Sequence, residues 1–455
     1  MANKQRLEKT VQTQVAVLDA GIVKTAKLVN QESARTVKRT RAYWNVLGPG
    51  LTTGASDDDP SGIATYSQTG AQFGFKFLWL APLTFPLMSI VQEMCARIGL
   101  VTGRGLAGNI RLHFSKKLLY ACTLSLFIAN AFNIGADLGA MASAVQLLNH
   151  GLSYTAILLA FALLTVLLQI YLPYARYAHI LKWLAMILLA YVVSAILAHV
   201  DWATVARKTI TPSVSWNKDE LLLICAILGT TISPYLFFWQ TSQEVEDEIV
   251  KGKTSVMARQ KEVSKRQIHS MRIDVWSGML LSNVVMFFII AACGAILFPQ
   301  GIVNIQSASQ AAEALRPFAG SATYWLFSLG IIGTGLLAIP VLAGSSSYAV
   351  SESFKWREGL YRKFHQAHAF YGVIILSVLI GLGINFLGIN PIKALIYSAV
   401  ANGIVAPLIL ATIVIISSKK SIMGKWVNRP HTTWLGWGVT CVMMLAGAAA
   451  IWSFF

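Results

Sequence analysis

Long apolar runs alternate with short polar connections along most of this chain. Each run is about 20 residues long, which is the length that an α-helix needs to cross a bilayer; strands of a membrane barrel are about half as long and alternate apolar with polar residues. The pattern therefore predicts an all-α integral membrane protein with 11 transmembrane helices. We expect these helices near residues 46–72, 77–98, 118–148, 153–173, 177–199, 219–242, 273–298, 321–350, 369–388, 393–416 and 433–455.

The composition supports a membrane protein. Of the 455 residues, 55% are hydrophobic and 13% are charged, and the mean hydropathy is +0.58; soluble domains carry roughly 25% charged residues. Residues 1–42 are polar and basic and contain no apolar stretch typical of a signal peptide, so we predict a cytoplasmic basic arm there. The five cysteines fall inside apolar runs without metal or disulfide spacing, which is typical of packing residues.

The basic residues predict the orientation of the helices. Of 37 Lys and Arg residues, 31 fall in segments that share one side of the membrane if the N-terminus is inside. Lys and Arg are enriched in cytoplasmic loops, so we predict a cytoplasmic N-terminus and an extracellular C-terminus in the plasma membrane. The net charge of +17 reflects this asymmetry and not nucleic-acid binding. The most charged connection, residues 244–272, is expected to form a short cytoplasmic amphipathic helix, either as a connector or as a lipid contact.

The stretch from 48 to 74 lies where the first span is expected, yet it contains Asp57, Asp58, Asp59 and Pro60. Carboxylates are costly in hydrocarbon and Pro interrupts a helix, so this span must face protein or water. We interpret it as a discontinuous helix that forms a cation site near the middle of the membrane. In the alternative interpretation, the acids pair with Arg or cap a half-helix.

The sixth span contains a second interruption, at residues 229–235. Five spans separate the starts of the two interruptions, and paired broken helices in two halves are typical of transporters. An odd number of spans in each half makes the halves inverted repeats. We therefore predict a first repeat at 43–200, a second at 201–417 that includes the loop 244–272, and an inner loop with the last span at 418–455.

At these residues the chain resembles the Nramp (SLC11) divalent-metal transporters. The similarity covers residues 44–416 and includes the specific block at 92–103. The other matching positions are Gly48-Pro49-Gly50, Asp59-Pro60, Leu106-Ala107, Arg111, Gly135-Ala136-Asp137, Gly229 to Pro234, Ala343-Gly344 and Glu352. The resemblance implies the LeuT fold, with two inverted five-helix repeats and alternating access to a metal site at the midplane.

The chain departs from the family at the positions that bind metal and protons. Gly62 stands at the family's metal-binding Asn, and Ala140 at an acid of the third span. In the sixth span, Thr230, Ser233 and Tyr235 stand at the family's Ala, Met and His. This pattern resembles the divergent Nramp-related magnesium transporters.

These departures predict a change of substrate. A Met thioether favours soft transition metals, whereas Mg²⁺ takes oxygen ligands and keeps several waters. Since Gly62 and Ser233 are smaller than Asn and Met, we expect a wider, oxygen-lined cavity for partly hydrated Mg²⁺, with Mn²⁺ also accepted. The predicted ligands are Asp59 with one of Asp57 or Asp58, together with Thr230 and Ser233. We expect Gly62, Tyr235, Asp137 and Asn402 to line the site or the path to it.

We also predict transport without proton coupling. His is the side chain suited to proton transfer near neutral pH, whereas Tyr titrates near 10. A membrane potential favours uptake of a divalent ion by about 4.6 kcal/mol per 100 mV, twice the value for one charge.

The alternatives are a proton-coupled Mn²⁺/Fe²⁺ symporter and a LeuT-fold symporter of an organic cation, and a non-transporting sensor stays open. We find no catalytic constellation, so we do not expect an enzyme. The protein is expected to work as a monomer without a cofactor.

Overall fold

The computed structural model describes residues 48–172, 186–198, 200–261 and 263–453. The chain divides into two units, Met1–Gly48 and Pro49–Phe455, and the second unit holds every described helix. The predicted basic arm at 1–42 lies outside the described residues, as does part of the predicted fifth span. Helices are the only regular secondary structure within the described ranges.

Thirteen of the described helices lie within or overlap the predicted apolar runs. They are α2 (Pro49–Asp57), α3 (Pro60–Phe73), α4 (Leu80–Thr102), α6 (Lys116–Leu148), α7 (Tyr154–Tyr171), α9 (Ala190–Leu197), α11 (Lys218–Thr231), α12 (Pro234–Val250), α14 (Lys265–Ile296), α17 (Thr323–Phe354), α18 (His368–Ile384), α19 (Pro391–Ser418) and α21 (Pro430–Ser453). The short helices between them are α5 (Leu106–His113), α10 (Trp202–Ile210), α13 (Val256–Lys261), α15 (Ala308–Ala312), α16 (Arg316–Ala319) and α20 (Lys420–Met423). Single 3₁₀ turns occur at Met186–Leu189, Phe298–Gln300, Glu313–Leu315, Gly320–Ala322, Phe364–Gln366, Asn385–Leu387 and Gly424–Trp426.

Within the described residues, eight helical segments are long and apolar enough to cross a membrane. They correspond to eight of the 11 predicted spans. Of the other three, the first is divided into two short helices and the second contains Glu93 and Arg97. The fifth is described only in part. The structure thus confirms a multi-span helical protein, while the count of 11 stays a prediction.

The connection predicted at 244–272 is shorter than expected. Helix α12 continues to Val250 and α14 begins at Lys265, so that only the six-residue α13 lies between them. The charged residues did not end α12 because they are satisfied inside the protein: Glu246 accepts hydrogen bonds from the hydroxyl of Tyr348 and the amide of Leu360. A short helix is therefore present in this connection, as the six-residue α13, and its amphipathic character stays a prediction.

Both predicted interruptions are present. Asp58 and Asp59 separate α2 from α3, and Ile232 and Ser233 separate α11 from α12. In each case the second half begins with proline, at Pro60 or Pro234. Proline is well suited to the first position of a helix, because it lacks only an N–H group that would have no partner there.

The two broken spans run antiparallel through the protein. Helix α3 packs against α11, and α2 packs against α12, so that each half of one span meets the opposite half of the other. Helix α14 lies along both α2 and α3. A Cβ atom on Gly54 would lie 2.2 Å from the carbonyl oxygen of Gly278, so glycine at these positions permits the close contact. Because α2 meets α12 and α3 meets α11, the two interruptions lie close together.

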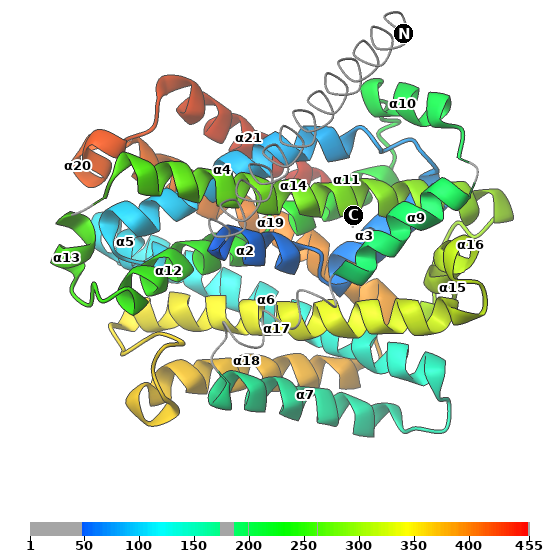
Figure 1. The fold of residues 1–455 in the computed structure, drawn as a ribbon, viewed down its shortest axis with the longest axis horizontal. Helices are drawn as coiled ribbons and strands as arrows, with labels where there is room; N and C mark the ends of the chain where they lie inside the picture. Colours follow the sequence, from blue (N-terminus) through cyan, green and yellow to red (C-terminus); the bar gives the residue numbers. More distant parts are fainter. Residues whose placement is uncertain (1–47, 173–185, 199, 262, 454–455) are drawn as a thin grey trace, which may run out of the picture. The chain divides into compact units, whose positions relative to one another are not determined.

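The other helices surround this pair. Helix α6 packs against α17, α18 and α19, and α7 packs against α6 and α18 at one edge of the bundle (Figure 1). Helix α21 packs against α19 and α11. The contacts of α6 and α19 matter most for the site, because both helices also reach α3.

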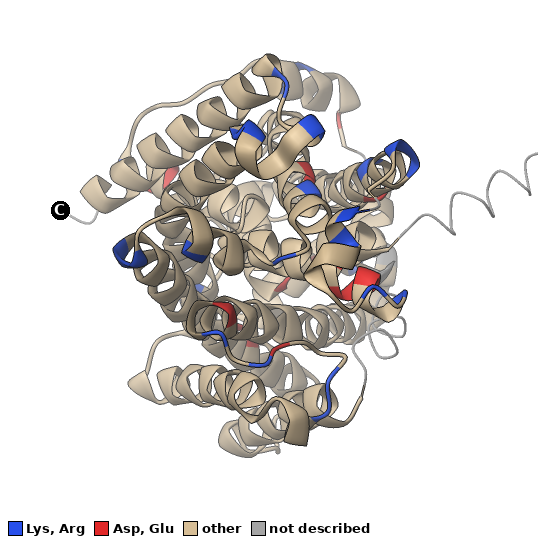
Figure 2. Cartoon of the chain, turned by 90° about the vertical axis from the view of Figure 1, so that its left-hand side faces the viewer, with Lys and Arg blue, Asp and Glu red and all other residues tan. Residues whose placement is uncertain are grey.

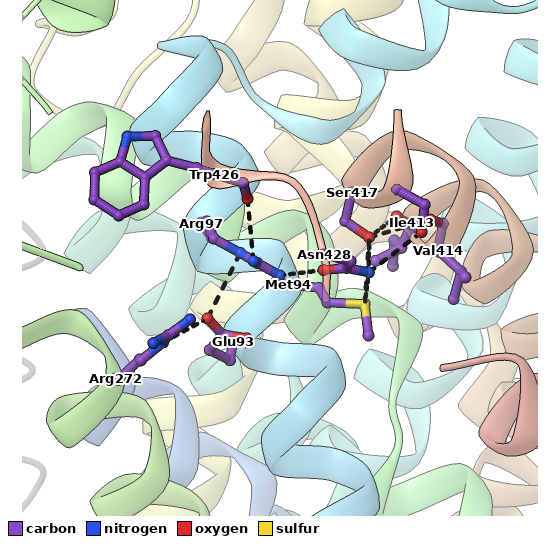
Figure 3. A network of polar contacts seen from close by, with 10 residues as sticks. Glu93, Met94, Arg97, Arg272, Ile413, Val414, Ser417, Trp426 and Asn428 are labelled. Atoms are coloured by element: carbon purple, nitrogen blue, oxygen red, sulfur yellow. Dashed lines mark hydrogen bonds and ion pairs between the residues drawn. The ribbon is translucent and has the colours of Figure 1, made fainter. Parts of the chain in front are cut away.

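Glu93 and Arg97 form an ion pair on α4, with 3.5 Å between the Arg97 Nε and the Glu93 Oε1 atoms. Arg272 on α14 donates to the same oxygen at 2.9 Å. The guanidinium of Arg97 also donates to the carbonyl of Trp426 and to the side chain of Asn428, beyond α19 (Figure 3). The pair therefore belongs to a network that joins α4, α14 and the connection to α21.

Candidate metal site at the two helix interruptions

Asp59 is the N-cap of α3. Its Oδ1 atom accepts hydrogen bonds from the amide of Gly62 and the hydroxyl of Ser61, each at 2.7 Å. Such a cap stabilises a helix start by about 1 kcal/mol, because it satisfies an amide that the helix leaves without a partner. The predicted ligand Asp59 is thus buried at the interruption and already has a structural role there.

A chain of hydrogen bonds fixes the other oxygen of Asp59. The amide of Asn133 on α6 donates to Asp59 Oδ2 at 3.0 Å. The hydroxyl of Ser398 on α19 donates to Asn133 Oδ1 at 2.7 Å. This chain joins three helices at the first interruption and holds the carboxylate in one orientation.

Asp57 and Asp58 contact a different helix. The hydroxyl of Ser282 on α14 lies 2.6 Å from Asp57 Oδ2 and 3.3 Å from Asp58 Oδ1. Both carboxyl groups are buried, and Asp57 Oδ1 has no hydrogen-bond partner among the described residues. Asp57 and Asp58 therefore share one donor, and Asp57 keeps a free oxygen.

The second interruption is neutral. Ser233 precedes α12, but its side chain does not cap that helix. Its hydroxyl instead donates back to the carbonyl oxygens of Gly229, at 2.8 Å, and Thr230, at 2.6 Å. The hydroxyl of the predicted ligand Ser233 thus donates to carbonyls at the end of α11, while the lone pairs of its oxygen stay available to bind a cation. The hydroxyl oxygen of Thr230 is buried without a partner among the described residues.

The two interruptions meet in space. The hydroxyl of Tyr235 donates to the carbonyl oxygen of Ser56 at 3.1 Å, which links the start of α12 to the end of α2. A Cβ atom on Gly62 would lie 3.2 Å from the hydroxyl of Thr230 and 3.3 Å from the carbonyl of Asp57. The sequence prediction that these residues come together is therefore correct.

The predicted widening of the cavity at Gly62 stays a prediction, and in this conformation the position is closely surrounded. The position that a larger side chain would take is bordered by the hydroxyl of Thr230 and the ring of Tyr66, which lies 3.4 Å away. Neighbouring side chains occupy the space that the small residue leaves. A hydrated ion would need these helices to move apart before it reached the aspartates.

Asp137 lies one helical turn beyond Asn133 on α6. It is fully buried, and neither of its carboxyl oxygens has a hydrogen-bond partner among the described residues. It is close enough to Asp59 for the two carboxyl groups to interact electrostatically. The predicted path residue Asp137 therefore belongs to the same polar centre.

Asn402 lies one turn beyond Ser398 on α19, and residues four apart share a helix face. Both polar atoms of its side chain are buried without a partner in the described part of the chain. The next residue, Gly403, packs against Gly229 of α11. Asn402 is thus at the level of the second interruption, and its role in lining the site or path stays a prediction.

The centre combines free oxygen atoms from four helices. A buried polar atom without a partner is costly, so it indicates a place for water or a ligand. The unpaired oxygens are Asp57 Oδ1, both oxygens of Asp137, Thr230 Oγ1 and Asn402 Oδ1. Within the described residues, however, no three His, Cys, Asp or Glu side chains are already arranged to hold a metal ion. This conformation offers the donors without a completed coordination sphere.

Two supporting residues were not predicted. Ser282 follows Gly278 by four residues on the face of α14 that packs against α2, a spacing of small residues that was visible in the sequence. Asp274 accepts hydrogen bonds from the amides of Gly50, at 2.7 Å, and Leu51, at 3.0 Å, and so holds the first turn of α2. An acid near the start of a predicted span was the only local signal of that role.

Comparison with known proteins agrees with this geometry. Residues 50–453 match the family model described as natural resistance-associated macrophage protein-like, Nramp. The divalent metal cation transporter MntH of Klebsiella pneumoniae is 24% identical over 424 residues, which covers 92% of this chain and 96% of that protein. MntH of Caldanaerobacter subterraneus is 24% identical over 411 residues, covering 89% and 92% of the two chains. These relatives are named as transporters and not as enzymes, in line with the sequence analysis.

Solved structures show the same fold. A manganese transporter of Eremococcus coleocola, in complex with an aromatic bis-isothiourea compound, superposes with a TM-score of 0.66 at 18% identity, covering 89% of this chain and 85% of that one. Mhp1, a nucleobase-cation-symport-1 family transporter in a closed conformation, gives a TM-score of 0.56 at 15% identity over 90% and 91% of the chains. These similarities confirm the predicted LeuT-type helical architecture. With the family model spanning nearly all of the described helices, the chain belongs to the Nramp family.

Proposed function

We propose that this protein transports divalent metal cations across the membrane, with Mg²⁺ as its main substrate and Mn²⁺ as a second one. The observation that carries the proposal is the meeting of the two helix interruptions, where buried carboxylates lie beside free neutral oxygens. Buried carboxylates without cationic partners are costly, and a divalent ion supplies the missing charge. The MntH relatives, named as divalent metal cation transporters, support the same class of substrate.

The preference for Mg²⁺ follows from the donor atoms. The positions at which the family carries Met and His are Ser233 and Tyr235 here, so the second interruption offers hydroxyl and carbonyl oxygens. Hard cations such as Mg²⁺ bind oxygen, whereas a thioether favours softer metals. Since Mg²⁺ usually keeps several waters, one or two carboxylates from the first interruption are enough to hold it.

Alternating access explains how an ion can reach aspartates that are buried in this conformation. The two interruptions divide each broken span into halves that can move separately. When one pair of halves moves away, the aspartates become accessible to a partly hydrated ion from that side. The ion then bridges Asp59 and Asp57 or Asp58 with the oxygens of Thr230 and Ser233, while Gly62, Tyr235, Asp137 and Asn402 line the site and path.

We propose that the transport is not coupled to protons. Ala140 carries no titratable group, and the phenol of Tyr235 is occupied as a hydrogen-bond donor to Ser56. A tyrosine with an ordinary pKa near 10 is also a poor relay at neutral pH. The membrane potential alone favours uptake by about 4.6 kcal/mol per 100 mV for a divalent ion, twice the value for one charge.

Uptake by proteoliposomes that contain an internal pH dye tests both parts of the proposal. We expect Mg²⁺ and Mn²⁺ to enter without acidification of the lumen, and we expect a variant with Asp59→Asn to lose uptake. Metal-driven acidification would instead favour a proton-coupled Mn²⁺/Fe²⁺ symporter, a class that shares its metal with the manganese transporter of Eremococcus coleocola. Absence of any metal uptake would reject the transport proposal itself.

The orientation and assembly are also proposals. We place the N-terminus in the cytoplasm and the C-terminus outside the plasma membrane, and we propose a functional monomer. Figure 2 supports the orientation, because many Lys and Arg residues gather at one end of the helices. Labelling of single cysteines introduced at Lys265 and Lys393 in intact cells tests it, since only the second site should react with an impermeant reagent.

A further inference from the structure

A cavity of about 310 Å³ lies away from the aspartates, at the end of the helices shown in Figure 2. It is bordered by α5, the last turns of α12, α13 and the segment that follows α17. Six basic and three acidic residues are among its lining residues. The basic residues are Arg104, Arg111, Arg259, Lys355, Arg357 and Arg362.

Two of the acids accept hydrogen bonds from the protein. Glu352 accepts hydrogen bonds from the amide of Gly108 at 2.7 Å and from the hydroxyl of Ser242 at 3.3 Å. Glu246 accepts them from the amide of Leu360, at 2.6 Å, and from a tyrosine hydroxyl. Protein donors therefore already compensate part of the negative charge of these two carboxylates.

The third acid adds little negative charge. Glu358 lies outside the membrane-spanning helices, and its Oε2 atom is buried without a partner among the described residues. Burial, together with the nearby charge of Glu352, raises the pKa of Glu358 to about 9. This raised pKa reduces the negative charge that the carboxyl group adds to the cavity at neutral pH.

Three of the six basic side chains already donate to backbone carbonyls: Arg111 to that of Glu352, Arg362 to that of Glu358, and Arg259 to three others. The guanidinium of Arg259 donates to the carbonyls of Gly103, Lys253 and Thr254 at 2.9 to 3.0 Å, which makes it part of the wall. In contrast, the side chains of Arg104, Lys355 and Arg357 make no hydrogen bond or ion pair with the described residues. The cavity thus has more positive than negative charge, and three of its basic side chains have no hydrogen-bond or ion-pair partner among the described residues.

We propose that this cavity binds a phosphoryl group, with Arg104, Lys355 and Arg357 as its ligands. A concave site lined by one sign of charge concentrates the electrostatic potential. The guanidinium group binds phosphate oxygens in pairs, and a lysine adds a mobile point charge. The cavity volume accommodates one phosphate or one phospholipid headgroup, and both sources present the same anionic oxygens.

The test compares two double substitutions that remove the same charge at the same end of the protein. K355Q/R357Q changes the cavity, whereas K265Q/R266Q changes two exposed residues at the start of α14 that do not line it. Neither pair belongs to the candidate metal site, so Mg²⁺ uptake without added phosphate should be unchanged in both. This proposal is therefore independent of the proposed transport function.

Thermal unfolding of the protein in phosphatidylcholine nanodiscs supplies the readout. One arm adds inorganic phosphate against chloride at equal ionic strength, and the other replaces part of the lipid by phosphatidylglycerol. We expect one arm to raise the Tm of the wild type and of K265Q/R266Q. In K355Q/R357Q the apparent affinity for the phosphate or phospholipid that raises the Tm should be weaker. We expect it to fall about tenfold for each charged side chain that the substitutions remove.

The arm that responds identifies the source of the phosphoryl group. If K355Q/R357Q does not fold, Arg104→Gln replaces it in the same comparison. An equal response of the cavity variant and its control in both arms, or no response of the wild type in either arm, would overturn the proposal.

Discussion

The two interruptions that form the candidate site hold their helices in different ways. The first is charged, and hydrogen bonds position it: Asp59 caps α3 and receives a donor from α6, while Ser282 of α14 holds Asp57. The second is neutral, and close packing positions it, because Gly229 lies directly against α19. The comparison indicates a division of roles, in which one broken helix supplies charge and the other supplies a fixed, uncharged wall.

Asp59 gives the sharpest test of this division. Asp59→Ala removes the charge and the cap, and Asp59→Asn removes the charge while it keeps a capping oxygen. Since removing one partner of a buried charge pair costs about 2–5 kcal/mol, we expect both variants to lose Mg²⁺ uptake by about a hundredfold. Asp59→Ala should also lower the thermal stability by about 1 kcal/mol more than Asp59→Asn, because it alone removes the cap. Uptake retained by Asp59→Asn would show that the charge is not used for transport.

The corresponding test of the second interruption is steric. A Cβ atom on Gly229 would lie 2.1 Å from the carbonyl oxygen of Ala399 and 2.5 Å from the amide of Gly403, so Gly229→Ala must push α11 and α19 apart. We expect a loss of about 1–3 kcal/mol of stability, typical of overpacking. Gly438→Ala on α21 is the matched control, because its Cβ would meet nothing within 4 Å. Equal melting temperatures for the two variants would contradict the role of close packing.

The same contrast explains which parts of the site were predictable. Three acids followed by proline in an apolar run are hard to place in a continuous helix that faces lipid. The first interruption, and its contact with the second, could therefore be predicted from the sequence. Asn133 and Ser282 have no such signature, since an amide or hydroxyl in a membrane helix contacts many kinds of partner. The neighbours of Gly62, Thr230 and Tyr66 among them, depend on packing in three dimensions and could not be read from the sequence.

The prolines show a similar limit to what the sequence predicts about helix interruptions. Pro60 and Pro234 begin new helices, whereas Pro86, Pro340 and Pro407 lie within continuous ones. What distinguishes the first two is the preceding residue, Asp59 or Ser233, whose backbone is extended. A proline alone therefore does not predict an interruption.

Ser282 tests how α14 supports the charged side. Ser282→Ala leaves a buried oxygen of Asp57 without its donor, at a cost of about 1–3 kcal/mol when no metal is bound. A bound cation would relieve that cost, so Mg²⁺ should raise the melting temperature of this variant more than that of the wild type. The control is Ser277→Ala on the same helix, where the hydroxyl only donates to the carbonyl of Ile273. Identical Mg²⁺ effects in both variants would contradict a role for Ser282 at the site.

Substitution of Tyr235 tests whether the second interruption takes part in proton transfer. Tyr235→Phe removes the hydrogen bond to the Ser56 carbonyl, which contributes about 1 kcal/mol, and leaves the ring in place. If the phenol is only structural, the variant should melt slightly earlier, while the ratio of Mg²⁺ uptake at pH 6 and pH 8 stays that of the wild type. A change in this ratio, or lumenal acidification that the variant abolishes, would make Tyr235 a proton relay. The second interruption would then contribute to coupling as well as to shape, and the division of roles between the two broken helices would fail.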